Sequence, residues 1–326
     1  MKKTLLYLFT ACVSFFACKK ITEGFLSDTL RYTSPALYCQ RGLALVQSDK
    51  IYLDGSTPPV TFEMQNLRDS SGGKLPEAFN TKYEITVFKT GVTFNVDTDT
   101  TVELLNQKRE TIQTVPMEFN TVSGQLTFNR ASTNIPLGIY NFDIQATNRN
   151  GTKFYPSFGS IHVVDPTEED MFTQEDNVNN VFSDADGSSQ AVKNPKLTFR
   201  KVSDEGARII LKIIDKNGNA FNPAAGEIMA RGDRPTFENY ARFNPVIFSD
   251  TAMICDFEVA PFPLAPYIDA TTNWAHLIYY RIPSNHVTID GFPDGKYSAN
   301  PRFAFQIKLE GTFIVQLQLT DAVRKP

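Results

Sequence analysis

Short stretches in which apolar and polar residues alternate constrain the fold of this chain most. The alternation recurs along the first half of the chain, at residues 51–55, 60–64, 83–88, 101–105, 124–128, 138–146 and 159–164. A period of two places every second side chain on one face of a β-strand. Gly, Asn, Ser and Pro, which favour turns, separate the stretches, as at residues 70–73 and 148–151. The pattern predicts a two-sheet β-sandwich over residues 45–165.

The end of this predicted sandwich contains a recognisable strand entry. Pro136, Gly138 and Tyr140 form a P-x-G-x-Y pattern, and an Ile-Gln-Ala-Thr-Asn run follows at residues 144–148. The segment resembles the last hairpin of bacterial Ig-like and cadherin-like modules. That resemblance implies an Ig-like fold for the first sandwich and implies nothing about a ligand.

An acidic stretch follows the first sandwich. Eight Asp or Glu residues and no Lys or Arg fall between residues 165 and 190. Thr167 is placed to cap a short helix, and the rest of 166–195 is expected to be an acidic, solvated linker. Asp184 and Asp186 also suggest a calcium loop. However, their glycine is fourth rather than sixth and the twelfth position is Pro195, so the linker is the favoured interpretation.

Strand patterns resume after residue 195. They occur at residues 197–202, 208–214, 246–248, 253–259, 302–309 and 312–319. Asn217-Gly218 is a strong signal for a tight hairpin turn, and we expect 302–309 to pair with 312–319 across Glu310 and Gly311. The sequence therefore predicts a second β-sandwich over 196–326 with an aromatic-rich insertion. The fold class is all-β, with two β-sandwich domains in tandem after a signal peptide.

The start of the chain has the organisation of an export signal. Two lysines precede an apolar run of about a dozen residues, the length of a signal-peptide core. A further lysine pair ends that run well before the roughly 20 residues of a membrane span. The run ends in Phe-Phe-Ala-Cys at residues 15–18, which resembles the lipobox of bacterial lipoproteins. The resemblance implies a cleaved lipoprotein signal peptide at 1–17 and a diacylglycerol-modified, N-acylated Cys18.

Several acyl chains on one cysteine would anchor the protein firmly, because each buried methylene contributes about 0.8 kcal/mol. Residues 18–44 are expected to form a polar tether that contributes at most an edge strand. The expected location is the outer membrane, with the periplasmic or surface face left open because the residues after Cys18 are basic. The alternative is an ordinary signal-peptidase cut, in which Cys18 has no role.

The net charge bears on the class of binding partner, and the cysteine positions bear on disulfide formation. The net charge is −4, and it falls to about −6 once the two signal lysines are removed, which argues against nucleic acid as a partner. Outside the signal and Cys18, the cysteines are Cys39 and Cys255. Cys255 lies in a predicted strand, so a free buried thiol is favoured there over a disulfide with Cys39.

The motifs of common enzymes are missing from the sequence. There is no Gly-rich phosphate loop, G-x-S-x-G, H-E-x-x-H or C-x-x-C. The only histidines are His162, His276 and His286, and nothing in their spacing points to a catalytic triad. We therefore expect a non-catalytic protein that needs no cofactor or metal.

The stretch 261–301 contains the strongest candidates for ligand contact. Aromatic residues lie there among Pro, Asn, Asp and Gly, including Tyr267, Tyr297 and Trp274, the only tryptophan. Aromatic rings stack on the C–H faces of sugars, and polar neighbours bind the hydroxyls. The alternative is that these rings belong to the core or rim of the second sandwich. Arg231-Gly232-Asp233 matches an adhesion tripeptide, but a turn is the simpler interpretation.

In its organisation the chain resembles the β-sandwich lipoproteins of Bacteroidota that accompany SusC/SusD-type outer-membrane import systems. The lipobox, the size, the Ig-like first module and the aromatic-rich second module carry this resemblance. It implies a lipid-anchored protein that binds a glycan or assists an uptake complex. The alternative is a structural or adhesive module of the cell envelope that contacts another protein.

Overall fold

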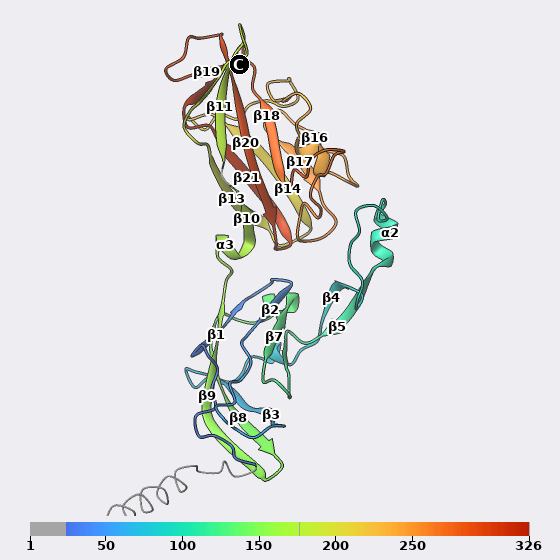
Figure 1. The fold of residues 1–326 in the computed structure, drawn as a ribbon, viewed down its shortest axis with the longest axis vertical. Coiled ribbons are helices and arrows are strands. Elements are labelled where there is room, and N and C mark those ends of the chain that lie inside the picture. Colours follow the sequence, from blue (N-terminus) through green and yellow to red (C-terminus); the bar gives the residue numbers. More distant parts are fainter. Residues whose placement is uncertain (1–23, 176, 326) are drawn as a thin grey trace, which may run out of the picture.

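The structure is a computed structural model that describes residues 24–175 and 177–325; the expected signal peptide 1–17 and Cys18 lie outside them. The fold is mostly β, as predicted, and Figure 1 shows strands along most of the molecule. The described residues contain no helix with the length and hydropathy of a membrane span. Their buried apolar side chains form two clusters: the N-terminal cluster, from Leu30 to Val163, and the C-terminal cluster, from Phe172 to Ala322.

The N-terminal cluster lies between a four-stranded and a three-stranded sheet. The order of the first is β1-β9-β8-β3 and that of the second is β2-β7-β6. The bounds are β1 Ala36–Gln40, β2 Leu45–Gln47, β3 Thr61–Asp69, β6 Met117–Phe119, β7 Leu126–Asn129, β8 Gly138–Asn148 and β9 Gly151–Val164. Tyr140 of the P-x-G-x-Y pattern is 1% exposed, and its hydroxyl donates to the Pro136 carbonyl at 3.0 Å. This bond fixes the start of β8 to the chain that leads into it.

A two-stranded arm extends from this region and reaches towards the C-terminal one (Figure 1). It consists of β4 (Tyr83–Phe88), α2 (Val102–Gln107) and β5 (Arg109–Thr114). The prediction of a strand at 101–105 was wrong, because Thr101 caps the helix by accepting a hydrogen bond from the Leu104 amide, and Leu105 is the helix residue that becomes buried. The remaining helical turns of the region are η1 (Glu77–Phe79) and η2 (Arg130–Asn134).

Part of the expected tether belongs to the fold. Leu30 and Tyr32 are buried in the N-terminal cluster. This segment does contribute an edge strand, β1, which lies at the end of its sheet and pairs with β9 in parallel. The described part of residues 18–44 is thus packed rather than a free spacer, because its alternate apolar side chains complete the cluster.

The expected acidic linker is also largely structured. Thr167 and Asp170 form the capping box of α3 (Glu168–Met171), as the sequence predicted. The segment that follows was expected to be solvated, but it forms β10 (Phe172–Gln174), β11 (Val178–Ser183) and β12 (Ser189–Ala191). Val181 in β11 is fully buried. The acids lie at the turns and ends of these strands, so they do not prevent the intervening apolar residues from joining the core.

Two sheets enclose the C-terminal cluster. One has the order β12-β11-β20-β18-β15 with β10 on β20, and the other has the order β13-β21-β14-β17-β16. The further bounds are β13 Lys196–Ser203, β14 Ala207–Ile214, β15 Met229–Ala230, η3 Phe237–Tyr240, β16 Ile247–Phe248, β17 Met253–Asp256, β18 Leu277–Arg281, β19 Val287–Ile289, β20 Tyr297–Ile307, β21 Gly311–Gln318 and β22 Ala322–Arg324. Phe262 and Phe172 contact Phe313 between the sheets.

The predicted pairing of 302–309 with 312–319 was wrong. β20 pairs with β11 and β18, whereas β21 crosses to the opposite sheet and pairs with β13 and, in parallel, with β14. Two adjacent alternating stretches are compatible with either a hairpin or a crossover, and packing across the cluster selects the crossover. The Asn217-Gly218 turn is present, with Gly218 at φ +91°. Cys39 and Cys255 are free and buried in different clusters.

Candidate functional site

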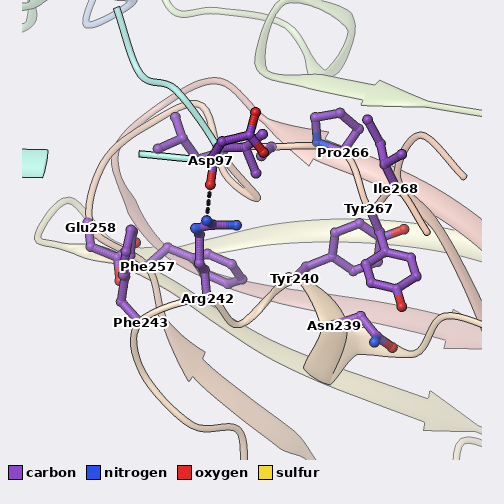
Figure 2. Close-up of a pocket in the computed structure, with 13 residues that line it drawn as sticks. Asp97, Asn239, Tyr240, Arg242, Phe243, Phe257, Glu258, Pro266, Tyr267 and Ile268 are labelled. Atoms are coloured by element: carbon purple, nitrogen blue, oxygen red, sulfur yellow. Dashed lines mark hydrogen bonds between the residues drawn. The ribbon is translucent and has the colours of Figure 1, made fainter. Parts of the chain in front are cut away.

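A cavity of about 510 Å³ lies where a loop of the arm meets the C-terminal region. Figure 2 shows its labelled side chains. The arm contributes Val96 and Asp97. The C-terminal region contributes the rest of the lining: Asn239, Tyr240, Arg242, Phe243, Phe257, Glu258, Leu264, Ala265, Pro266, Tyr267 and Ile268.

A short helical turn positions Tyr240. Thr236 and Asn239 form a capping box around η3. The Tyr240 hydroxyl donates to the Leu277 carbonyl at 2.7 Å. Burial raises the pKa of Tyr240, so the hydroxyl stays protonated and the ring is a fixed wall of the cavity.

Tyr267 lies on a hairpin-like loop. The Tyr267 amide donates to the Ala275 carbonyl at 3.0 Å, and the Trp274 amide donates to the Tyr267 carbonyl at 2.9 Å. The Tyr267 ring meets the Tyr240 ring edge to face, with centroids 6.3 Å apart. Because Tyr267 is only partly buried whereas Tyr240 is 5% exposed, Tyr267 offers the larger aromatic surface to a ligand.

Arg242 joins the two sides of the cavity. Its guanidinium group donates to the carbonyls of Val96 and Asp99 in the arm loop, and Figure 2 shows one of these bonds beside Asp97. The group also lies about 6 Å from the ring centres of Phe94 and Phe243. These contacts hold the arm loop over the cavity.

Glu258 is the carboxyl group of the site whose pKa is moved towards neutral pH. Burial raises its pKa to about 7, with a smaller contribution of the same sign from Asp256 and an opposing one from Arg109. Its carboxyl accepts from the Asn244 side-chain amide at 2.9 Å. Near neutral pH this carboxyl both donates and accepts hydrogen bonds, which suits the recognition of hydroxyl groups.

The structure separates the three aromatic residues singled out in the sequence. Tyr267 lines the cavity, whereas Trp274 and Tyr297 do not. Trp274 turns away on the same loop, with its indole N–H donating to Asp269 at 2.6 Å and its ring edge to face with Tyr279. Tyr297 packs on Phe292, with ring centres 4.9 Å apart. Cys18 lies outside the described residues.

Sequence reasoning missed most of the cavity. Arg242, Glu258 and Asp97 come from three segments that no local pattern connects. Tyr240 was not singled out either. The docking of the arm determines the site, and only long-range contacts reveal it.

Other candidate groups are engaged elsewhere. Asp184, considered as part of a calcium loop, pairs with Arg281 at 2.9 Å and accepts from Ser284. Asp186 accepts from Ser188 in a turn. Within residues 24–175 and 177–325, no group of three or more His, Cys, Asp or Glu side chains is placed to hold a metal ion. The Arg231-Gly232-Asp233 segment is a turn, closed by the Arg234 amide donating to the Arg231 carbonyl.

Comparison with protein-family models, with curated proteins and with solved structures finds no match for this chain. The site therefore has to be interpreted from its own geometry.

Proposed function

We propose that this protein is a non-catalytic, lipid-anchored binding protein of the outer membrane, and that the cavity beside Tyr267 binds a glycan. The observation that carries the proposal is the combination of rings and polar groups in one cavity. Its volume lies within the roughly 300–1,000 Å³ typical of small-ligand sites. Tyr267 offers a stacking surface, while Asn239, Arg242 and Glu258 supply hydrogen bonds around it.

A binding screen with soluble glycans tests this proposal. Purified protein would be titrated with neutral and charged oligosaccharides, with Tyr267→Ala run in parallel. Loss of one stacking ring is expected to weaken binding by about tenfold or more. Tyr297→Ala is the matched control, because Tyr297 is also partly buried and packs on a ring outside the cavity.

The two variants separate the outcomes. Weaker binding in Tyr267→Ala with normal binding in Tyr297→Ala supports the cavity as the glycan site, provided that circular dichroism shows both folds intact. Equal binding by both variants would move the site elsewhere. No binding of any saccharide by the wild type would overturn the proposed function.

The lipid anchor has its own test. Metabolic labelling with a radioactive fatty acid is expected to mark the wild-type protein and not Cys18→Ala, and the variant is expected to leave the outer-membrane fraction. Protease treatment of whole cells would then distinguish surface from periplasmic display. Labelling that survives in Cys18→Ala would remove the lipobox interpretation.

We also propose that the chain forms two domains in tandem and that the first is Ig-like; two observations support this. The N-terminal and C-terminal clusters share no buried residue. The hydrogen bond from Tyr140 to the carbonyl four residues upstream resembles the tyrosine corner of Ig-like sandwiches. Expression of residues 166–326 alone tests the division, since an independent domain would unfold cooperatively.

The alternative function is adhesion to another protein, favoured by one edge strand. β16 lies at the end of its sheet and exposes Ile247 (61%) and Phe248 (43%). Unpaired edge strands are templates for pairing with another chain. Ile247→Lys would abolish binding to outer-membrane vesicles under this alternative and would leave glycan binding unchanged.

A further inference from the structure

Three arginines gather on one face of the β11–β20–β18 sheet, and the part of the chain that the structure describes gives them no acidic partner. They are Arg231 and Arg234, on the turn after β15, and Arg302 in β20. Among the described residues none of their guanidinium groups makes an ion pair or a side-chain hydrogen bond, and the Nε atom of Arg302 is buried without an acceptor. A buried donor without an acceptor is costly, which suggests that a ligand supplies one.

Aromatic rings stack against Arg231 and Arg234. The guanidinium carbon of Arg231 lies 4.6 Å from the ring centre of Phe182 and 5.8 Å from that of Tyr279. That of Arg234 lies 4.9 Å from Trp274 and 5.9 Å from Tyr279. Stacking occupies a flat face of the guanidinium group and leaves its N–H edge free to bind an anion.

The three positive charges act on one another. Tyr279 and Arg302 are directly paired across β18 and β20, so their side chains share a face. The pKa of Arg231 is lowered, first by burial and then by the charges of Arg234 and Arg302. Like charges held together in this way repel, and an anion bound between them would relieve the repulsion.

None of the nearby carboxylates among residues 24–175 and 177–325 forms an ion pair with the cluster. Asp269 is turned to the indole N–H of Trp274 and to Thr271, and the first of these bonds is the main reason that its pKa falls to about 2. Asp233 is exposed between the two turn arginines and pairs with neither. Glu175 lines a depression with Arg302 but makes no ion pair with it.

We propose that Arg231, Arg234 and Arg302, supported by Trp274 and Tyr279, bind the carboxylate or sulfate group of an acidic oligosaccharide. This inference rests on the proposed glycan-binding function and adds the class of saccharide. The loop that presents Tyr267 to the cavity presents Trp274 to the arginines, so the two surfaces are the two sides of one loop. Guanidinium groups recognise carboxylates and sulfates through paired N–H donors.

Trp274 makes the test specific, because it is the only tryptophan of the chain. Its fluorescence would be followed while purified protein is titrated with oligogalacturonate and, separately, with the fully methyl-esterified form. Dextran sulfate and dextran provide the same comparison for sulfate. An acidic ligand is expected to change the emission as Arg234 engages it, whereas the uncharged form of the same backbone leaves the emission unchanged.

Substitution of single arginines tests where the acidic saccharide binds. Arg234→Gln is expected to weaken acidic-saccharide binding by about tenfold, the loss of one charge-assisted contact, and Arg234→Lys to weaken it less. Arg200→Gln is the matched control, because Arg200 is an exposed arginine on β13 in the same region, also without a partner. Added salt is expected to reduce the wild-type affinity.

Each outcome decides a separate point. Equal affinity for the charged and uncharged forms would overturn the acidic preference and leave the proposed glycan binding standing. Acidic-saccharide binding that Arg234→Gln and Arg200→Gln leave equally intact would overturn this site. Failure of every saccharide, neutral or acidic, would overturn both proposals.

Discussion

The arginines where the arm meets the C-terminal region differ from those on the β11–β20–β18 face in what surrounds them. Arg130 pairs with Glu310 and donates to the Ala260 carbonyl, and Arg242 donates to two carbonyls of the arm loop. Arg231 and Arg234 stack on aromatic rings, and the described residues offer their guanidinium groups no acceptor. The first pair therefore holds two segments of the protein together, whereas the second pair keeps its donors available for a ligand. Substitutions should therefore affect stability in one place and binding in the other.

Arg130→Met should produce the largest change. The Arg130 side chain is 16% exposed, and burial lowers its pKa against the opposing charge of Glu310. Removing it leaves the Ala260 carbonyl and Glu310 without their donor, at a cost of about 2–3 kcal/mol in the free energy of unfolding. Denaturant titration followed by circular dichroism measures this, with Arg200→Met expected to stay within about 0.5 kcal/mol. An equally small loss of unfolding free energy in Arg130→Met and in Arg200→Met would contradict a role for Arg130 in joining the two segments.

Arg242→Met should have a smaller and more local effect. The methionine keeps an apolar stem against Phe94 and Phe243 but loses the donors to Val96 and Asp99, at a cost of about 1–2 kcal/mol. Hydrogen exchange is expected to become faster at residues 91–100. Arg281→Met, which removes an exposed ion pair with Asp184, should leave exchange in that loop unchanged. Unaltered exchange in both variants would mean that other contacts hold the arm.

The sequence identified the all-β class and several local signals but not the long-range arrangement. Alternation located β3, β4, β8 and β14, and the turn at Asn217-Gly218 formed as expected. The arrangement of β20 and β21 could not be predicted, because alternation shows which face is buried and not which sheet buries it. The same reason explains the cavity: Tyr267 was singled out from composition, but Arg242 and Glu258 lie in other segments that only the fold brings beside it, and Val96 and Asp97 come from the arm.

Glu258 gives this contact region a pH dependence between mildly acidic and neutral pH. Its pKa rises from an ordinary value of 4.5 to about 7 in the folded protein. The folded state therefore holds a proton that the unfolded state has lost, and stability should fall as pH rises through the window from about 4.5 to 7. Solvent screens the half-buried carboxyl, so we expect a decrease of about 2–4 °C in Tm.

Glu258→Gln is the control for this decrease of Tm with rising pH. The amide has the shape of the protonated acid and does not titrate, so the Tm of this variant minus that of wild type should grow from pH 5 to pH 8. Differential scanning calorimetry at several pH values measures this difference. A constant difference would mean that the carboxyl is already ionised at pH 5 in the folded protein.

The smallest expected effect is the coupling free energy between the side chains of Arg234 and Trp274. A double-mutant cycle of Arg234→Ala and Trp274→Leu, measured by denaturant titration, should give about 0.5–1 kcal/mol, as for an exposed cation over an indole ring. That value lies below the expected loss at Arg130, although the two guanidinium groups carry the same charge. The difference arises because Arg130 donates to the carbonyl of the buried Ala260 and pairs with Glu310, while Arg234 stacks on a ring. A coupling as large as the loss at Arg130 would make Arg234 a structural residue, and its free N–H groups would then no longer indicate a ligand.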